Sequence, residues 1–258
     1  MRLMKRILSA AAVLALSASL LVGCSSGTAS SVPVSASSAA ESTVSSVEET
    51  ASSAVDENEA AAAQLLNDLT GSYQELWPVI LADEYKQTWL DDCTALVGEE
   101  NAEAAFEKLS SMVTGDVYGE DAVEAYANGG GAYFCGFTND LATLTFDGEA
   151  STISGTDKDG NELFSHPYHY IGMEPVRGLY EFESDDADSG EFTYFFLAPD
   201  TSAETYHIEF RYGSDAEALS QYDAGEYAYW VASGISTDCD QTMIDNCIEL
   251  FCTENLAG

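Results

Sequence analysis

Residues 132–210 alternate between apolar and polar side chains in short runs, and this pattern constrains the fold more than any other feature of the sequence. Alternation with a period of two is expected of strands, whose successive side chains point to opposite faces. Turn signals such as Asp147-Gly148, Asp159-Gly160 and Ser189-Gly190 separate the runs. The predicted strands are 133–137, 142–146, 168–171, 179–182, 192–197 and 206–210. About six or seven strands in meander order predict a barrel or strongly curled sheet, because closure removes exposed strand edges.

Helical periodicity surrounds this region on both sides. Apolar residues recur at helical spacing over 58–69 and again, after Pro78, over 77–89. Further helices are predicted over 99–112, 119–126, 214–222 and 238–251. The glycines at 129–131 mark the change from helical to alternating character. The predicted fold class is therefore α+β, an antiparallel β-barrel of about six to nine strands bracketed by N-terminal and C-terminal helices.

The first 24 residues have the features of an export signal that ends in a lipid-attachment site. Arg2, Lys5 and Arg6 precede an apolar run over 7–22, which is shorter than the roughly 20 residues needed to span a membrane. The sequence Leu-Val-Gly-Cys that ends at Cys24 resembles the lipobox of bacterial lipoproteins, in which the cysteine is acylated. Two or three acyl chains give a stable anchor. We therefore expect a lipoprotein held to the membrane through Cys24, at the extracytoplasmic face of the bacterial cell envelope.

The segment from Ser25 to about Ala60 cannot contribute to a core. It consists mainly of Ser, Ala, Thr, Val and Glu and contains no aromatic residue. Such a composition predicts a disordered tether, with a root-mean-square span of roughly 30 to 35 Å. The expected organisation is a signal peptide over 1–23, a tether over 24–60 and one folded domain over 61–258.

The charge of the chain excludes nucleic-acid binding. Its formal net charge is -37, from 45 acidic and 8 basic residues. The cations beyond the N-terminus are Lys86, Lys108, Lys158, Arg177 and Arg211. Five scattered cations cannot form a patch that neutralises phosphates. An acidic surface favours solubility instead, and it attracts cations.

Three histidines, His166, His169 and His207, limit any imidazole chemistry. On the predicted strand around 204–210, His207 and Glu209 share one face. A polar face of this kind inside a barrel mouth could bind a divalent ion, and the alternative is a solvated strand face with an ordinary histidine. His166 and His169 are three positions apart with Pro167 between them, so a regular strand sends them to opposite faces. Of these two, His169 is expected to point into the barrel.

Two acidic loops, 157–160 and 185–190, superficially suggest calcium sites. Neither combines a glycine at the sixth position with the terminal bidentate glutamate of a twelve-residue calcium loop, so both are predicted to be hairpin turns. The sequence also contains no Gly-x-Ser-x-Gly motif, no glycine-rich phosphate loop and no His-Glu-x-x-His motif. We therefore do not expect an enzyme.

Five cysteines remain beyond Cys24, an odd number without a Cys-x-x-Cys pair. They are Cys93, Cys135, Cys239, Cys247 and Cys252, and the last three fall in the predicted C-terminal helix or directly after it. Their spacings place no pair in the usual register of metal ligands. Buried apolar thiols are expected, and one disulfide to Cys93 or Cys135 is the alternative.

The order of segments from about Leu66 to Phe251 resembles the ZinT (YodA) family, lipocalin-like zinc-binding proteins of the bacterial envelope. Residues 66–78 are similar to the family's opening, a lipocalin-type Gly-x-Trp segment, with Tyr73 at the tryptophan position. Residues 168–172 and 182–192 are similar to a Tyr-Lys-Tyr-x-Gly strand and to the hairpin that follows it. Residues 203–208 resemble the family's metal-binding strand. The resemblance implies a lipocalin-like (calycin) barrel.

The resemblance also implies a zinc site, for which this sequence has only part of the ligands. The family uses one histidine in a Ser-Asp-His strand and two in a His-aromatic-His strand. Only His207 matches: Thr205 stands at its partner's position, and residues 195–199 contain no histidine. A single imidazole cannot hold zinc tightly, because structural and transport sites need three or four ligands. The candidates that could complete the site are His169, Asp200, Glu204 and Glu209.

The leading hypothesis is a surface-anchored lipoprotein that binds a divalent metal, zinc or cadmium. It would sequester the metal or deliver it to the components of a zinc-uptake transporter. The competing hypothesis is a metal-free barrel that binds a small apolar ligand or acts as a structural module.

Overall fold

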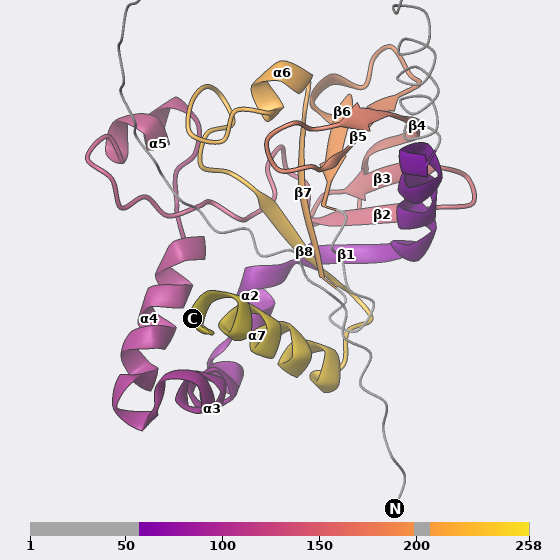
Figure 1. The fold of residues 1–258 in the computed structure, drawn as a ribbon. Helices are drawn as coiled ribbons and strands as arrows, with labels where there is room; N and C mark the ends of the chain where they lie inside the picture. The colour runs from indigo at the N-terminus through magenta and orange to yellow at the C-terminus, as the bar shows by residue number, and fades with distance from the viewer. Residues whose placement is uncertain (1–56, 199–206, 258) are drawn as a thin grey trace, which may run out of the picture. The chain divides into compact units, whose positions relative to one another are not determined.

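The computed structural model describes residues 57–198 and 207–257, and a closed barrel of antiparallel strands lies at its centre (Figure 1). The strands pair in chain order, and the last closes onto the first through Tyr73 and Ser236. They are β1 (Gly71–Glu75), β2 (Thr143–Asp147), β3 (Thr152–Thr156), β4 (Glu162–Met173), β5 (Tyr180–Ser184), β6 (Tyr194–Leu197), β7 (His207–Gly213) and β8 (Ala232–Ser236). The predicted α+β barrel is thus confirmed.

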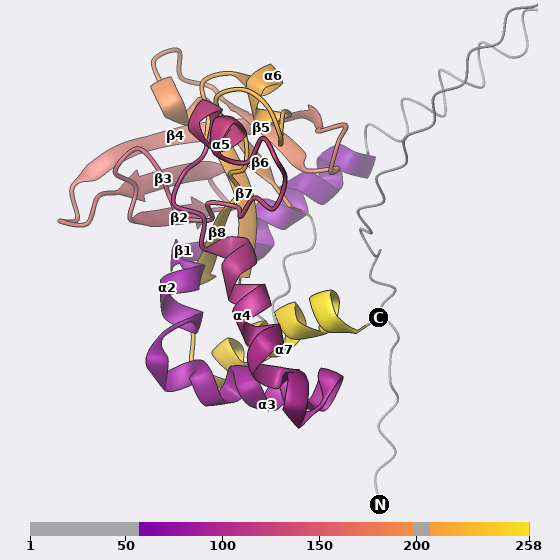
Figure 2. The ribbon, with the colours of Figure 1, turned by 90° about the vertical axis from the view of Figure 1, so that its left-hand side faces the viewer.

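Four helices gather at one end of the barrel and share a second core (Figures 1 and 2). They are α2 (Leu76–Ile80), α3 (Lys86–Val97), α4 (Ala102–Val113) and α7 (Gln241–Leu256). Trp89, Leu109 and Ile248 are completely buried between them. The remaining short elements are α5 (Glu120–Ala125), α6 (Ala216–Leu219) and the 3-10 turns Asp83–Tyr85, Glu99–Asn101 and Gly190–Phe192. A helix over 57–68 precedes the first strand and α7 follows the last, so helices bracket the barrel as predicted, but α2 to α5 follow β1 instead of preceding every strand.

Residues 57–68 form a helix that packs on the barrel core through its apolar face. Ala62 and Leu66 are buried there, as the helical spacing predicts. The turn between β2 and β3 passes very close to this helix, because a Cβ on Gly148 would lie 2.4 Å from the Cα of Asn67. The helix includes residues 57–60, which the predicted boundary assigns to the tether.

Aromatic rings fill the interior of the barrel. Phe195 is completely buried, and its ring centroid lies 5.4 Å from those of Tyr168 and Tyr212. Phe164 stacks on Phe192 at 3.9 Å. Apart from Phe192, which lies in the 3-10 turn Gly190–Phe192, these rings come from the apolar positions of the alternating strands, so the pattern that predicts the barrel also fills it. Within the described residues, the inward-facing side chains of the barrel therefore form a packed core.

Arg211 is completely buried on the outer side of β7. Its guanidinium donates hydrogen bonds to the backbone carbonyls of Leu219, Gln221 and Tyr227. It also lies over the ring of Tyr222, at 4.4 Å. Within the described residues no carboxylate pairs with it, and burial lowers its pKa. Arg211, one of the five scattered cations of the sequence, thus holds residues 219–227 against the barrel.

The strand predictions differ from the structure in two ways: one predicted strand does not form, and three strands of the barrel were not predicted. Residues 133–137 form no strand, and Phe134 makes only isolated bridges with Thr114 and Trp230. Conversely, β1, β3 and β8 are not among the predicted strands, because their sequences contain many small or polar residues and show weak alternation. These three strands form because neighbouring strands on both sides bond to them.

No helix within residues 57–198 and 207–257 has the length and apolar character that a membrane crossing requires. The predicted signal peptide, Cys24 and almost all of the tether lie outside the described residues, as do the predicted ligands Asp200 and Glu204.

Candidate functional site

Strand β7 presents His207 and Glu209 on the outer face of the barrel. Ile208, Phe210 and Tyr212 of the same strand are 0–1% exposed and belong to the barrel core. The expectation that the polar face of this strand lines a barrel mouth is therefore wrong. Burial of the apolar set fixes which face of a strand turns inward, and every other residue must then turn outward. His207 is half-buried and Glu209 is exposed.

His207 and Glu209 border a small cavity between the barrel wall and two helices, α2 and α7. Its volume is about 30 Å³, enough for a guest of about the size of a water molecule. Helix α7 contributes Cys247 and Glu254 to the lining, and α2 contributes Trp77. One imidazole, two carboxylates and one thiol therefore border a single cavity.

The three-histidine zinc centre implied by the family resemblance does not fit these residues. Among the described residues, no three His, Cys, Asp or Glu side chains form a group that could hold a metal ion. Burial raises the pKa of the Cys247 thiol to about 12, so this sulfur is protonated near neutral pH and is a poor metal ligand. His207, Glu209 and Glu254 border the same cavity, but they do not by themselves form such a group, so a metal there would need ligands from outside the described residues.

The other two histidines each bind an aspartate in the loop after β5. His169 Nδ1 lies 2.8 Å from Asp185 Oδ1, and its side chain is 52% exposed. His166 Nδ1 lies 2.8 Å from Asp186 Oδ2, and its side chain is only 17% exposed. His166 shares the inner face of β4 with the buried Phe164, on whose ring it stacks. The expectation that His169 points into the barrel is therefore wrong.

The structure does not bring His169 to His207, because strands β5 and β6 lie between β4 and β7. Of the predicted ligands, it places only Glu209 beside the cavity that His207 lines. Asp200 and Glu204 fall within 199–206, outside the described residues. Glu254 was missed, because no local pattern marks it and only the packing of α7 on the barrel brings it there.

The cysteines match the expectation of buried thiols. Cys93, Cys135, Cys247 and Cys252 are buried and Cys239 is partly buried, and all five are free. Cys239 lies before α7 rather than within it, since the helix is capped by Asp240. The sulfurs of Cys93 and Cys252 lie 3.9 Å apart between α3 and α7.

Comparisons with known proteins find a likeness only among solved structures, since no family model and no curated protein matches the chain. The Zn(II)-bound ZinT-like domain of Streptococcus pneumoniae AdcA is 17% identical, with a TM-score of 0.45, over 71% of this chain and 89% of that one. Zn(II)-bound AdcA from the same species is 15% identical, with a TM-score of 0.42, over 72% of this chain and 35% of that one. This chain thus spans about a third of AdcA. The first of these structures is a ZinT-like domain, the kind of domain that the order of segments resembles.

Proposed function

We propose that this protein is a lipid-anchored, extracytoplasmic binding protein that takes up a divalent metal ion at the cleft between β7 and α7. The observation that carries the proposal is the shared cavity, where the His207 imidazole and the carboxylates of Glu209 and Glu254 border one ion-sized space. Asp200 and Glu204 precede His207 closely in sequence, and we propose them as further oxygen ligands. His169 is left out, because it belongs to a separate ion pair with Asp185.

The chemistry of this donor set defines what the site would do. Imidazole favours zinc and related soft ions such as cadmium, whereas carboxylates accept many divalent ions. With one nitrogen donor, the site would bind zinc reversibly, which suits sequestration or delivery to an uptake transporter better than a permanent structural role. The surface charge supports capture, because a net charge of -37 raises the local concentration of cations.

Calorimetric titration of the full chain with zinc tests the site. We expect a dissociation constant in the micromolar range or weaker, and loss of most of the binding in His207→Ala. Glu254→Gln should weaken binding severalfold. His166→Ala is the matched control, since this histidine is held by Asp186 in another part of the barrel, and it should bind zinc normally. Absence of zinc binding in the parent chain, or equal binding in His207→Ala, would favour a metal-free barrel.

The pH dependence of zinc binding follows from the same ligand. Only the neutral imidazole can donate its electron pair to a metal, so protonation competes with zinc. The affinity should therefore be constant above pH 7 and fall as the pH drops through about 6.5, the ordinary range of histidine. A site built from carboxylates alone would keep its affinity down to about pH 5.

The proposed anchor is tested separately at Cys24. Replacing Cys24 by serine removes the thiol that would carry the lipid, so we expect uncleaved precursor or a soluble product. Phase partitioning in detergent and the mass of the mature protein measure this directly. Unchanged partitioning together with an unchanged mature mass would contradict lipid attachment at this residue.

A further inference from the structure

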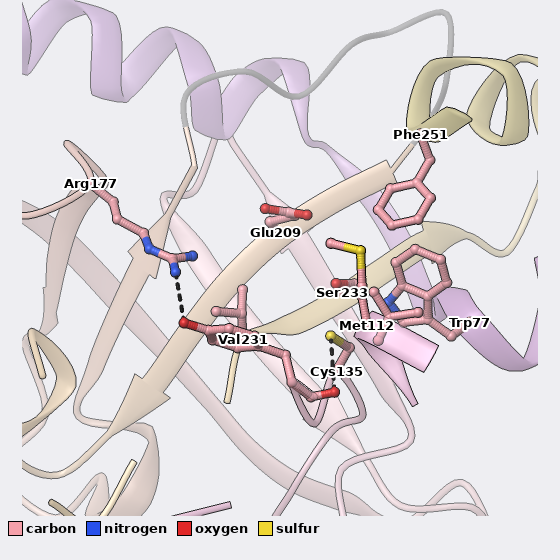
Figure 3. Close-up of a pocket in the computed structure, with 10 residues that line it drawn as sticks. Trp77, Met112, Cys135, Arg177, Glu209, Val231, Ser233 and Phe251 are labelled. Carbon is pink, nitrogen blue, oxygen red and sulfur yellow. Dashed lines mark hydrogen bonds between the residues drawn. The ribbon is translucent and has the colours of Figure 1, made fainter. Parts of the chain in front are cut away.

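A larger cavity lies beside the His207 cleft, on the same outer wall of the barrel (Figure 3). Its volume is about 130 Å³. A cavity of about 150 Å³ encloses a benzene molecule, and this cavity is open to solvent, so it can take a ligand of that size or a longer one whose end reaches its mouth. Strands β7 and β8 form the floor with Glu209 and Ser233, which are paired residues of the ladder. Trp77, Met112 and Phe251 form apolar walls from three helices.

Two buried polar groups in this cavity have no oxygen or nitrogen acceptor within the described residues. They are Trp77 Nε1 and Ser233 Oγ, and their residues are 7% and 1% exposed. Burying an N–H or O–H group without an acceptor costs free energy, so such groups call for an explanation. The neighbouring Cys135 sulfur is the acceptor within reach of both groups, but it is a weak one, and burial raises the pKa of its thiol to about 12, which keeps it neutral. A ligand that offers an acceptor atom would satisfy both groups.

Arg177 provides a cationic group at the opposite side of the same cavity (Figure 3). Its Nη2 donates a hydrogen bond to the Tyr133 hydroxyl at 3.1 Å, and its guanidinium lies 4.1 Å from the ring centre of Tyr222. These rings hold the guanidinium in place, yet among the described residues no carboxylate pairs with it. In a chain with 45 acidic residues, an unpaired arginine beside a cavity is unusual. Its planar fork of donors matches the two oxygens of a carboxylate.

We propose that this cavity binds a small zwitterion of the amino-acid class with a hydrogen-bond-accepting side chain. Its carboxylate would bind Arg177, its ammonium would face Glu209, and its side-chain acceptor would take the hydrogen bonds of Trp77 and Ser233. Glu209 lies between Arg177 and Trp77, so its carboxylate could pair with the ammonium group of a ligand that spans the cavity (Figure 3). The overall charge favours the same class, because a net charge of -37 repels a simple anion but not a neutral zwitterion.

Three matched probes test this assignment by calorimetry and tryptophan fluorescence on the full chain. L-glutamine carries all three groups, glutaramate lacks the ammonium group, and L-leucine lacks the side-chain acceptor. We expect glutamine to bind with a dissociation constant of about 1 mM or tighter, as its size allows. Both analogues should bind about tenfold more weakly or worse. No binding of glutamine at about 20 mM, or equal binding of either analogue, would overturn the proposal.

Two variants locate the ligand in this cavity. Arg177→Gln should weaken glutamine binding about tenfold or more, because it removes the charge that pairs with the carboxylate. Ser233→Ala should weaken it severalfold and change the thermal stability little, because within the described residues the hydroxyl has only the weakly accepting Cys135 sulfur as a partner. Lys108→Gln removes an exposed cation elsewhere and should change nothing. If Arg177→Gln fails to fold, Ser233→Ala decides, and full affinity in that variant would overturn the assignment.

Discussion

Replacing Arg211 by leucine should lower the free energy of unfolding by about 3 to 5 kcal/mol, one of the two largest effects we expect in this protein. Leucine fills much of the space, but it donates no hydrogen bond. The buried carbonyls of Leu219 and Tyr227 would lose their guanidinium donor, and the ring of Tyr222 would lose its cationic neighbour. Residues 219–227 would then detach from β7 more readily.

Urea denaturation followed by circular dichroism measures the effect of Arg211→Leu, and the melting temperature should fall by roughly 10 °C. Lys158→Leu is the matched control, because Lys158 is an exposed cation in the turn between β3 and β4. This control should change the stability by less than about 0.5 kcal/mol. A loss below about 1 kcal/mol in Arg211→Leu would show that the buried guanidinium does not fasten the segment.

Phe195→Ala should destabilise the barrel by about 3 to 5 kcal/mol, through the loss of buried ring surface and the cavity left behind. Phe195 is completely buried on β6, and its ring contacts those of Phe164, Tyr168, Phe210 and Tyr212. Neighbouring strands of a closed barrel cannot collapse freely into the space, so little of the loss is recovered.

Phe195→Leu provides the comparison, because it keeps an apolar side chain of similar length at the same site. We expect it to cost about 1 to 2 kcal/mol in the same denaturation experiment. Equal stability of the alanine and leucine variants would mean that the interior of the barrel is loosely packed, and it would reopen the hypothesis of a ligand cavity there.

The barrel could be predicted because its central strands carry strong alternation. β2, β5, β6 and β7 each match a predicted strand, and their alternate apolar residues form the core. Strand β8 could not be found this way, since Ala232–Ser236 contains two serines and a glycine. Its small residues suit close packing: a Cβ on Gly234 would lie 3.0 Å from the Ile208 side chain. The partners of β8, rather than its own residues, make it a strand.

The sequence predicted only part of the candidate metal site, because local spacing does not show how elements pack against one another. The spacing of His207 and Glu209 shows that they share a face of β7, but not whether that face turns inward. The answer depends on the interior of the barrel, which is filled by aromatic rings and leaves no place for polar groups. Glu254 and Trp77 line the site because α7 and α2 pack against the barrel there. No pattern within either helix predicts this contact.

The position of Glu209 has a consequence for the two proposed ligands, since this one carboxylate borders both cavities. A cation bound at His207 would neutralise the charge that the ammonium group of a zwitterion needs. By thermodynamic linkage, each ligand would then lower the affinity for the other by the same factor. The protein would act as an exchanger, releasing its metal where the zwitterion is abundant and taking it up where the zwitterion is scarce.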